Sequence, residues 1–317
     1  MSPVSAILPR ILFADLEATR RSFPQEVRDD PDRETFTLAV SIVRHFFGHQ
    51  WFLDHVFQDA ARSRPDGFMR IDYTPGAVGE SKTSRLLDFA ENLFNLQHID
   101  GFDDRVNQMR ADSLIESTFA EFDFARFLYI HDIDFKFVVP CGVAGKDYDY
   151  RIRYADGREV CADAKCRLEG TQMRAETIVN ALKKTRSNNL PHDEPGAVFV
   201  KVPASWLEDE AMCRGIAEAV RGFLRNTQRI VSVVIYAVVM IELKDRKMML
   251  MRHRFQEFDN LGHRFDRSKG WLLFRDYQVP KEWGGMPPKW HRIFSRISLR
   301  REGGSNPALG AFERCCL

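Results

Sequence analysis

An acid-x-lysine triplet, Asp163-Ala164-Lys165, lies in a stretch of sequence that is typical of a β-strand. Side chains alternate between the two faces of a strand, so Asp163 and Lys165 share one face while Ala164 points to the other. A carboxylate beside an ammonium group can hold a hard divalent cation next to a phosphate. This is the chemistry that phosphodiester hydrolysis needs, because a water must be activated and charge on the phosphate oxygens must be relieved.

A second carboxylate is expected directly across from this triplet. The turn Ala155-Asp156-Gly157 suits a three-residue hairpin loop, in which Gly157 takes the left-handed position. Such a loop pairs Tyr154 with Arg158, and counting outward then places Asp149 opposite Asp163. Two facing carboxylates repel each other, and a bound divalent cation turns that repulsion into a binding site.

The first strand of this hairpin alternates strictly between two sets of residues. One face is predicted to carry Asp147, Asp149, Arg151 and Arg153, and the other Tyr148, Tyr150, Ile152 and Tyr154. Asp147 competes with Asp149 for the role of first carboxylate. The hairpin register favours Asp149 and predicts an ordinary salt bridge between Asp147 and Lys165.

A third acid is expected from the helix that precedes the strands. At about 100° per residue, Glu121 shares a helix face with apolar residues that include Ala125 and Leu128. A carboxylate on an apolar face is costly unless a cation meets it. A metal site or Lys165 would be that partner; the alternative is a partly exposed glutamate at the edge of the face.

Hydrophobic periodicity predicts an α/β fold in which a mixed central sheet is flanked by helices. The predicted order α-β-β-β-α-β-α-β comprises a helix over 111–130, strands over 135–140, 147–154 and 158–167, a helix over 171–186, a strand over 197–202, a helix over 205–225 and a strand over 230–243.

An acid on one strand, an acid-x-lysine triplet on the next and a glutamate in the leading helix resemble the signature of PD-(D/E)XK nucleases. Tyr148 stands where the signature has proline, a change that the family tolerates. The resemblance covers residues 111 to about 240. It implies the αβββαβ restriction-endonuclease-like core, Mg²⁺ (or Mn²⁺) as cofactor, and hydrolysis of nucleic acid, with DNA the expected substrate. It assigns catalysis to Glu121, Asp149, Asp163 and Lys165, with the three acids as metal ligands.

The sequence predicts three parts: an N-terminal helical region (1–110), the nuclease-like core (111–250) and a basic, aromatic C-terminal segment (251–317) whose tail is expected to be disordered. Gln172, Lys183 and Lys184 are candidate substrate-binding residues. The alternatives are an ordinary polar residue at a helix start and two cations that complement a helix dipole. The C-terminal segment either tracks a nucleic-acid backbone or is a solvated surface with core aromatics.

Composition bears on the partners and the cellular location that can be expected. The net charge is only +1, so a site for a polyanion must come from local patterning. Six cysteines without a CxxC pair suit a cytoplasmic protein with reduced thiols. The longest apolar run, Ile230 to Leu243, falls short of the roughly twenty residues of a membrane helix, so no membrane partner is expected.

Several alternatives stay open. The chain could be a catalytically inactive nuclease-fold protein that binds nucleic acid or a protein partner, or an unrelated α/β protein that matches the signature by chance. The sequence also leaves open DNA versus RNA, endonuclease versus exonuclease action, and assembly as a homodimer or with a partner subunit.

Overall fold

The computed structural model describes residues 7–56, 77–111, 115–139, 141–168, 170–172, 174–243, 248–274, 290–291, 293 and 312–314. The chain forms two compact units, Met1–Arg126 with Pro288–Ala308 and Phe127–Pro287 with Leu309–Leu317. The boundary therefore falls inside a helix rather than at residue 110, and the segment 251–317 is divided between both units.

The first unit is helical. Its helices are α1 (Phe13–Ser22), α2 (Gln25–Arg28), α3 (Pro31–Phe47), α4 (His49–His55), α5 (Ala77–Leu96), α6 (Phe102–Ala111) and the first part of α7 (Ile115–Ile130). The single helix expected over 36–57 is divided into α3 and α4, because Gly48 has a φ of 87° that a continuing helix does not allow. Buried phenylalanines fill the core; Phe89, for example, contacts Phe119 and Phe122.

The second unit is built on a mixed sheet. Its strands are β1 (Asp134–Phe137), β2 (Tyr150–Arg153), β3 (Glu159–Cys166), β4 (Gly196–Lys201), β5 (Ile230–Leu243), β6 (Met248–Asp259) and β7 (Phe312–Arg314). They lie in this order across a seven-stranded sheet of the described residues. Strands β3, β4 and β5 are parallel to one another, whereas β1–β2, β2–β3 and β5–β6 pair antiparallel. The predicted α/β class with a mixed sheet and flanking helices is confirmed.

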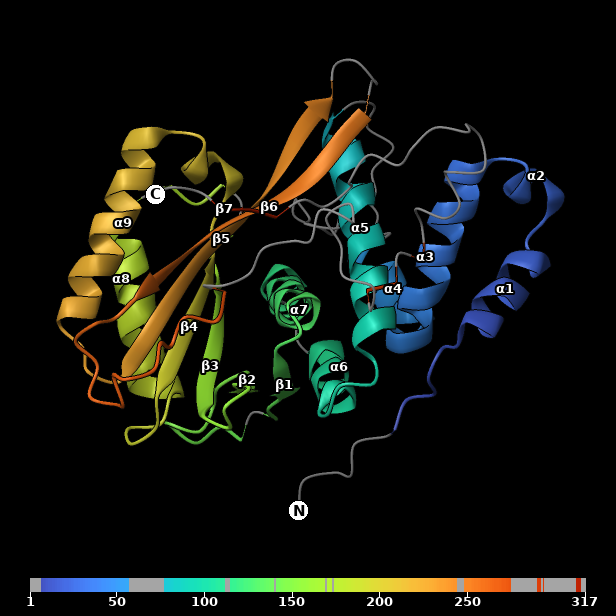
Figure 1. Cartoon of the computed structure of the whole chain (residues 1–317). Coiled ribbons are helices and arrows are strands. Elements are labelled where there is room, and N and C mark those ends of the chain that lie inside the picture. The colour runs from blue at the N-terminus through green and yellow to red at the C-terminus, as the bar shows by residue number, and fades with distance from the viewer. Residues whose placement is uncertain are drawn as a thin grey trace. The chain divides into compact units, whose positions relative to one another are not determined.

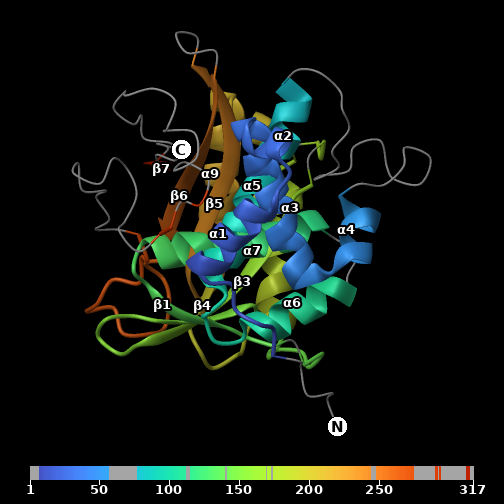
Figure 2. The same ribbon diagram turned by 90° about the vertical axis from the view of Figure 1, so that its right-hand side faces the viewer.

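Helices α8 (Ala175–Lys184) and α9 (Glu210–Arg225) cover one face of the central strands (Figures 1 and 2). Apolar side chains of both helices, such as Ile178 and Val220, form one buried cluster with Val198 and Val200 of β4. Every residue of β4 is buried, as expected of a parallel strand that is covered on both faces. The strand β3, which carries the acid-x-lysine triplet, lies next to β4 under this layer.

The opposite face of the sheet carries aromatic side chains. Phe127, from the last turns of α7, contacts Tyr236 of β5 and Phe255 of β6. Strand β6 was not predicted, because its charged and aromatic residues suggested a nucleic-acid-binding segment. In the parts of the chain that the structure describes, no helix has both the length and the apolar character that crossing a membrane requires.

Candidate active site

The triplet on β3 brings a carboxylate and an ammonium group into direct contact. Asp163 Oδ2 lies 2.6 Å from Lys165 Nζ. Asp163 is fully buried, while 27% of the Lys165 side chain is exposed. The predicted placement of both residues on one strand face therefore agrees with the structure, and Lys165 is the member of the pair whose side chain solvent partly reaches.

Two further side chains hold Asp163, and both come from the π-helical turn η1 (Thr185–Asn189) that follows α8. Thr185 Oγ1 donates to Oδ2 over 3.1 Å, and Asn189 Nδ2 donates to Oδ1 over 3.1 Å. Asn189 also donates to the backbone oxygen of Asp147, 3.0 Å away. Neither residue can be expected from the sequence, because no local spacing connects this turn to β3.

Asp149 lies at the same triplet. The hairpin has the predicted register, with Tyr150 paired to Ala162 and Tyr154 N donating to Arg158 O over 2.8 Å. The Asp149 carboxylate is only 6% exposed, and its Oδ2 accepts a 2.7 Å hydrogen bond from the backbone N–H of Ala164, the middle residue of the triplet.

The electrostatics of Asp163 reflect this crowding. Burial raises the pKa of the Asp163 carboxyl, and the negative charge of Asp149 raises it further, while Lys165 opposes both effects. The two acids thus repel each other in the structure, as the hairpin register predicted. A hard divalent cation would relieve this repulsion, because its preferred ligands are carboxylate oxygens.

The first hairpin strand departs from the predicted alternation. Tyr148 packs in the cluster with Cys161 beneath α8 and α9, whereas Tyr150 packs against Phe137 and Phe199. The prediction that both tyrosines share one face is therefore wrong. Strand β2 begins only at Tyr150, and the residues before it belong to a loop, where the period of two no longer applies.

The predicted salt bridge between Asp147 and Lys165 is also wrong. Asp147 Oδ1 accepts hydrogen bonds from the backbone N–H groups of Cys141 and Gly142, at 2.9 and 3.0 Å. An aspartate that stabilises a turn in this way is common in loops. Of the two competing acids, Asp149 is thus the one that contacts the triplet.

Glu121 belongs to the first unit, where it forms an ion pair with Arg105 of α6. Within its own unit, Arg105 is thus a cationic partner of the kind that the apolar surroundings of Glu121 require. In the part of the chain that the structure describes, no group of three or more His, Cys, Asp or Glu side chains is placed to hold a metal ion. The role of Glu121 as a third metal ligand stays a prediction.

We expect Glu121→Gln to destabilise the protein. The Arg105 side chain is only 5% exposed, and taking the negative charge out of a buried ion pair is destabilising because the arginine stays buried. The loss in unfolding free energy should be on the order of 3 kcal/mol. Urea denaturation checks this, with Glu116→Gln, on the same helix, as control; equal unfolding free energies for the two variants would contradict the structural role of the pair.

The predicted substrate-binding residues lie near the site in sequence but do not contact its acids. Gln172 is exposed in the loop before α8, and its Oε1 accepts a 3.2 Å bond from Arg174. Lys183 and Lys184 are exposed in the last turn of α8. Of the basic C-terminal segment, residues 275–289 and 294–311 lie outside the described residues. Trp271, which is described, is buried against Arg158 and Tyr154.

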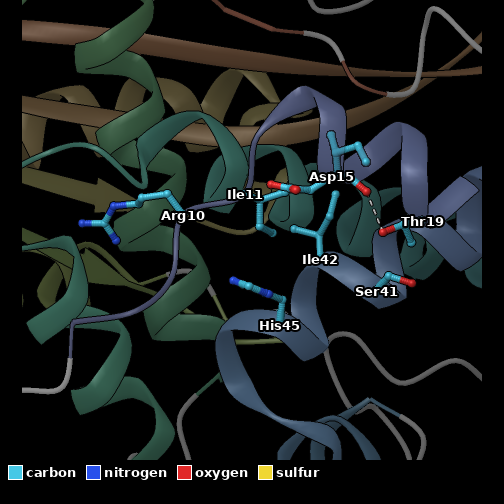
Figure 3. Close-up of a pocket in the computed structure, with 8 residues that line it drawn as sticks. Arg10, Ile11, Asp15, Thr19, Ser41, Ile42 and His45 are labelled. Carbon is cyan, nitrogen blue, oxygen red and sulfur yellow. Dashed lines mark hydrogen bonds between the residues drawn. The ribbon is translucent and has the colours of Figure 1, made fainter.

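The first unit has a small pocket between α1 and α3, shown in Figure 3. Its volume is about 100 Å³, well below the roughly 300 Å³ at which sites for small molecules begin. Its polar groups already have structural partners: His45 Nε2 contacts Pro9 O at 2.7 Å, and Asp15 accepts from the backbone N–H of Leu12. We therefore assign it no function.

No family model, no curated protein and no solved structure matches this chain. Its function has to be inferred from the site itself, in which two nearly or fully buried acids and one partly exposed lysine meet at β3.

Proposed function

We propose that this chain is a metal-dependent nuclease that hydrolyses phosphodiester bonds of nucleic acid, with DNA the expected substrate. The observation that carries the proposal is the meeting of Asp149, Asp163 and Lys165 at one triplet: Lys165 contacts Asp163 at 2.6 Å, and Asp149 binds the backbone N–H between them at 2.7 Å. Acids that repel each other beside an ammonium group suit a divalent cation and a phosphate.

The order of elements supports the same proposal. Helix α7, strands β1, β2 and β3, helix α8 and strand β4 follow one another as in the αβββαβ core that the PD-(D/E)XK resemblance implies. The triplet lies on the third strand of this series and Asp149 directly before the second. We therefore propose a restriction-endonuclease-like core for residues 111–250.

In the proposed mechanism, Asp149 and Asp163 would hold Mg²⁺ (or Mn²⁺), an ion that commonly uses only one or two carboxylates of the protein. The bound ion would lower the pKa of a coordinated water and neutralise charge on the phosphate. Lys165 orients the attacking water or contacts the phosphate, since its side chain is the partly exposed one of the pair with Asp163. Thr185 and Asn189 position Asp163 by fixing both of its oxygens.

One observation favours a second candidate function. Asp163 is fully buried and already has three partners, namely Lys165, Thr185 and Asn189. A carboxylate that is satisfied in this way suits a catalytically inactive nuclease-fold protein, in which the former site serves stability. The described cysteines Cys141, Cys161, Cys166 and Cys213 form no disulfide, which suits the proposed cytoplasmic location.

A cleavage assay separates the two functions. Purified protein is incubated with supercoiled plasmid, linear duplex, single-stranded DNA and RNA, each with Mg²⁺ or with EDTA. The nuclease proposal expects cleavage of at least one substrate in Mg²⁺ and none in EDTA. Binding without cleavage of any substrate would favour the inactive alternative, and cleavage that persists in EDTA would remove the metal-dependent mechanism.

We expect Asn189→Ala to weaken metal-dependent activity although Asn189 is not itself a proposed ligand. The substitution removes the bond to Asp163 Oδ1, and the loss of such an orienting partner typically reduces metal affinity or activity by about 10–100-fold. The matched control is Asn188→Ala, which alters an exposed neighbour in the same turn. Titration of cleavage against Mg²⁺ concentration measures the effect; identical Mg²⁺ dependence of both variants would exclude the positioning role.

A further inference from the structure

A second feature of the sheet unit is a groove lined by four arginines that are distant in sequence. Its volume is about 540 Å³. Arg186 lies in η1, Arg225 ends α9, Arg229 directly precedes β5, and Arg264 follows β6. We call this surface the arginine groove. The other residues that line it are all polar, namely Ser187, His192, Asn226, Thr227 and Gln228.

The arginines of the groove lack acidic partners. Elsewhere in the unit, arginines pair with carboxylates, as Arg151 does with Glu194 and Arg158 with Asp156. Within the described residues, no carboxylate lies within ion-pair distance of any of the four groove arginines. Mutual repulsion is evident in Arg229, whose pKa is lowered by burial and by the positive charges of Arg186 and Arg264. A cluster of like charges of this kind is stabilised when an anion binds to it.

Backbone contacts hold three of these arginines in place. Arg186 Nη1 donates to Asn226 O over 3.2 Å, and Arg229 Nη1 donates to Pro191 O over 3.2 Å. Arg264 donates to the backbone oxygen of His192. Each guanidinium has five N–H donors; Arg186 and Arg264 each use one in these contacts, whereas Arg229 also donates to the backbone oxygens of Leu190 and Arg186. Arg225 is exposed at the end of α9.

The lining indicates what kind of anion the groove accepts. Sites for small molecules are lined mainly by apolar and aromatic side chains, whereas the arginine groove has no apolar side chain and only one aromatic ring, that of His192. A ligand held there is recognised by its charge and not by a stacked base or a buried apolar group. The groove is also much larger than a single phosphate requires. A polymer that carries a phosphate on each unit is both recognised by its charge and long enough to fill the groove.

We propose that the arginine groove binds the backbone phosphates of a nucleic-acid strand, without recognition of the bases. This inference rests on the proposed nuclease function, which supplies the polymer, and it adds a substrate-binding surface away from the catalytic triplet. The turn η1 contributes to both sites: Thr185 and Asn189 hold Asp163, and Arg186 lines the groove.

The test measures binding to fluorescein-labelled oligonucleotides, single-stranded and duplex, by anisotropy in EDTA over a series of KCl concentrations. The groove variant is Arg225→Gln/Arg264→Gln. The control, Arg33→Gln/Arg214→Gln, removes the same charge from arginines whose side chains are 68% and 61% exposed and lie outside the groove. Arg225→Gln alone provides a variant in which no backbone contact is lost.

For the duplex, the slope of log affinity against log salt should become shallower by about 1.8 in the groove variant, or about 0.9 for each lost phosphate contact. Affinity at moderate salt should fall on the order of tenfold. Arg225→Gln alone should show about half of this change in slope, and the control variant should have the slope of the wild type. An unchanged slope in the groove variant would overturn the proposal.

The outcomes for the groove and for the nuclease are distinguishable. If the wild type cleaves in Mg²⁺ but its binding does not depend on the groove arginines, the nuclease proposal stands and the groove proposal is wrong. If binding depends on the groove arginines but no substrate is cleaved, the nuclease proposal is wrong and the groove proposal stands. A labelled polyphosphorylated peptide serves as a third probe: if it binds through the groove and neither oligonucleotide does, the proposed ligand is wrong.

Discussion

Lys165→Ala should strongly reduce metal-dependent cleavage while leaving nucleic-acid binding intact. Among the described residues, Lys165 is the only one whose cationic group is shown in contact with Asp163, and its side chain is partly exposed to solvent. If it acts on the attacking water or on the phosphate, its removal should lower the cleavage rate by about 10³-fold, the effect of losing one preorganised group that stabilises the transition state.

The control for this variant is Lys146→Ala, which removes an exposed lysine from the loop before the same hairpin. Removing Lys165 also leaves Asp163 buried without its cation, so Lys165→Met, which keeps most of the packing, is measured in parallel. Single-turnover cleavage and thermal unfolding are recorded for all three. A Lys165→Met protein that folds normally and cleaves at the wild-type rate would exclude a catalytic role for the lysine.

Asp163→Asn should have the second large effect, because it removes a proposed metal ligand. We expect cleavage to fall by more than the roughly 10–100-fold that the loss of a partner outside the metal shell causes, and Mg²⁺ titration should no longer saturate. Asp147→Asn is the matched control, since its Oδ1 can still accept the bonds from Cys141 and Gly142. If Asp147→Asn lowered cleavage as much as Asp163→Asn, Asp147 would belong to the site together with Asp149 and Asp163.

The same variant has a distinct effect on stability in the absence of metal. Burial and Asp149 raise the pKa of Asp163 to about 7 in the folded protein. The folded state therefore binds a proton more tightly than the unfolded chain does, and the resulting stabilisation is present in acid and lost as the pH rises toward 7. Relative to Asp163→Asn, the wild type should lose on the order of 3 kcal/mol between pH 4 and pH 7.

Urea denaturation of both proteins in EDTA measures this difference across that pH range. Taking the difference cancels groups common to both, such as His131, whose pKa burial lowers to about 4. A difference in unfolding free energy that does not change with pH would show that Asp163 is not held in the repulsive, buried setting described above.

The parts of the fold that repeat a local pattern could be predicted from the sequence. The strand expected over 230–243 is β5 with the same bounds, and the strand expected over 158–167 contains β3. Both are continuous or alternating apolar runs, which carry their own signal. The contact of Asp163 with Lys165 followed for the same reason, since two residues along a strand always share a face.

What the sequence could not show depends on residues that are far apart along the chain. Thr185 and Asn189 reach Asp163 only because a π-helical turn ends α8 beneath β3. The arginine groove gathers side chains from four segments. Glu121 has a cationic partner, as its apolar surroundings require. The sequence contains many cations that could fill this role, and no periodicity singles out Arg105. Tyr148 was misplaced because a period of two was extended past the end of a strand.

The central claim is that Asp149 and Asp163 share one divalent ion beside Lys165. Crystals grown with Mn²⁺ and measured at the manganese absorption edge test it most directly. We expect one anomalous peak within coordination distance, about 2.0–2.2 Å, of an oxygen from each carboxylate, and its disappearance in Asp163→Asn. A wild-type crystal in which the Lys165–Asp163 contact persists and manganese is found only elsewhere would contradict the claim.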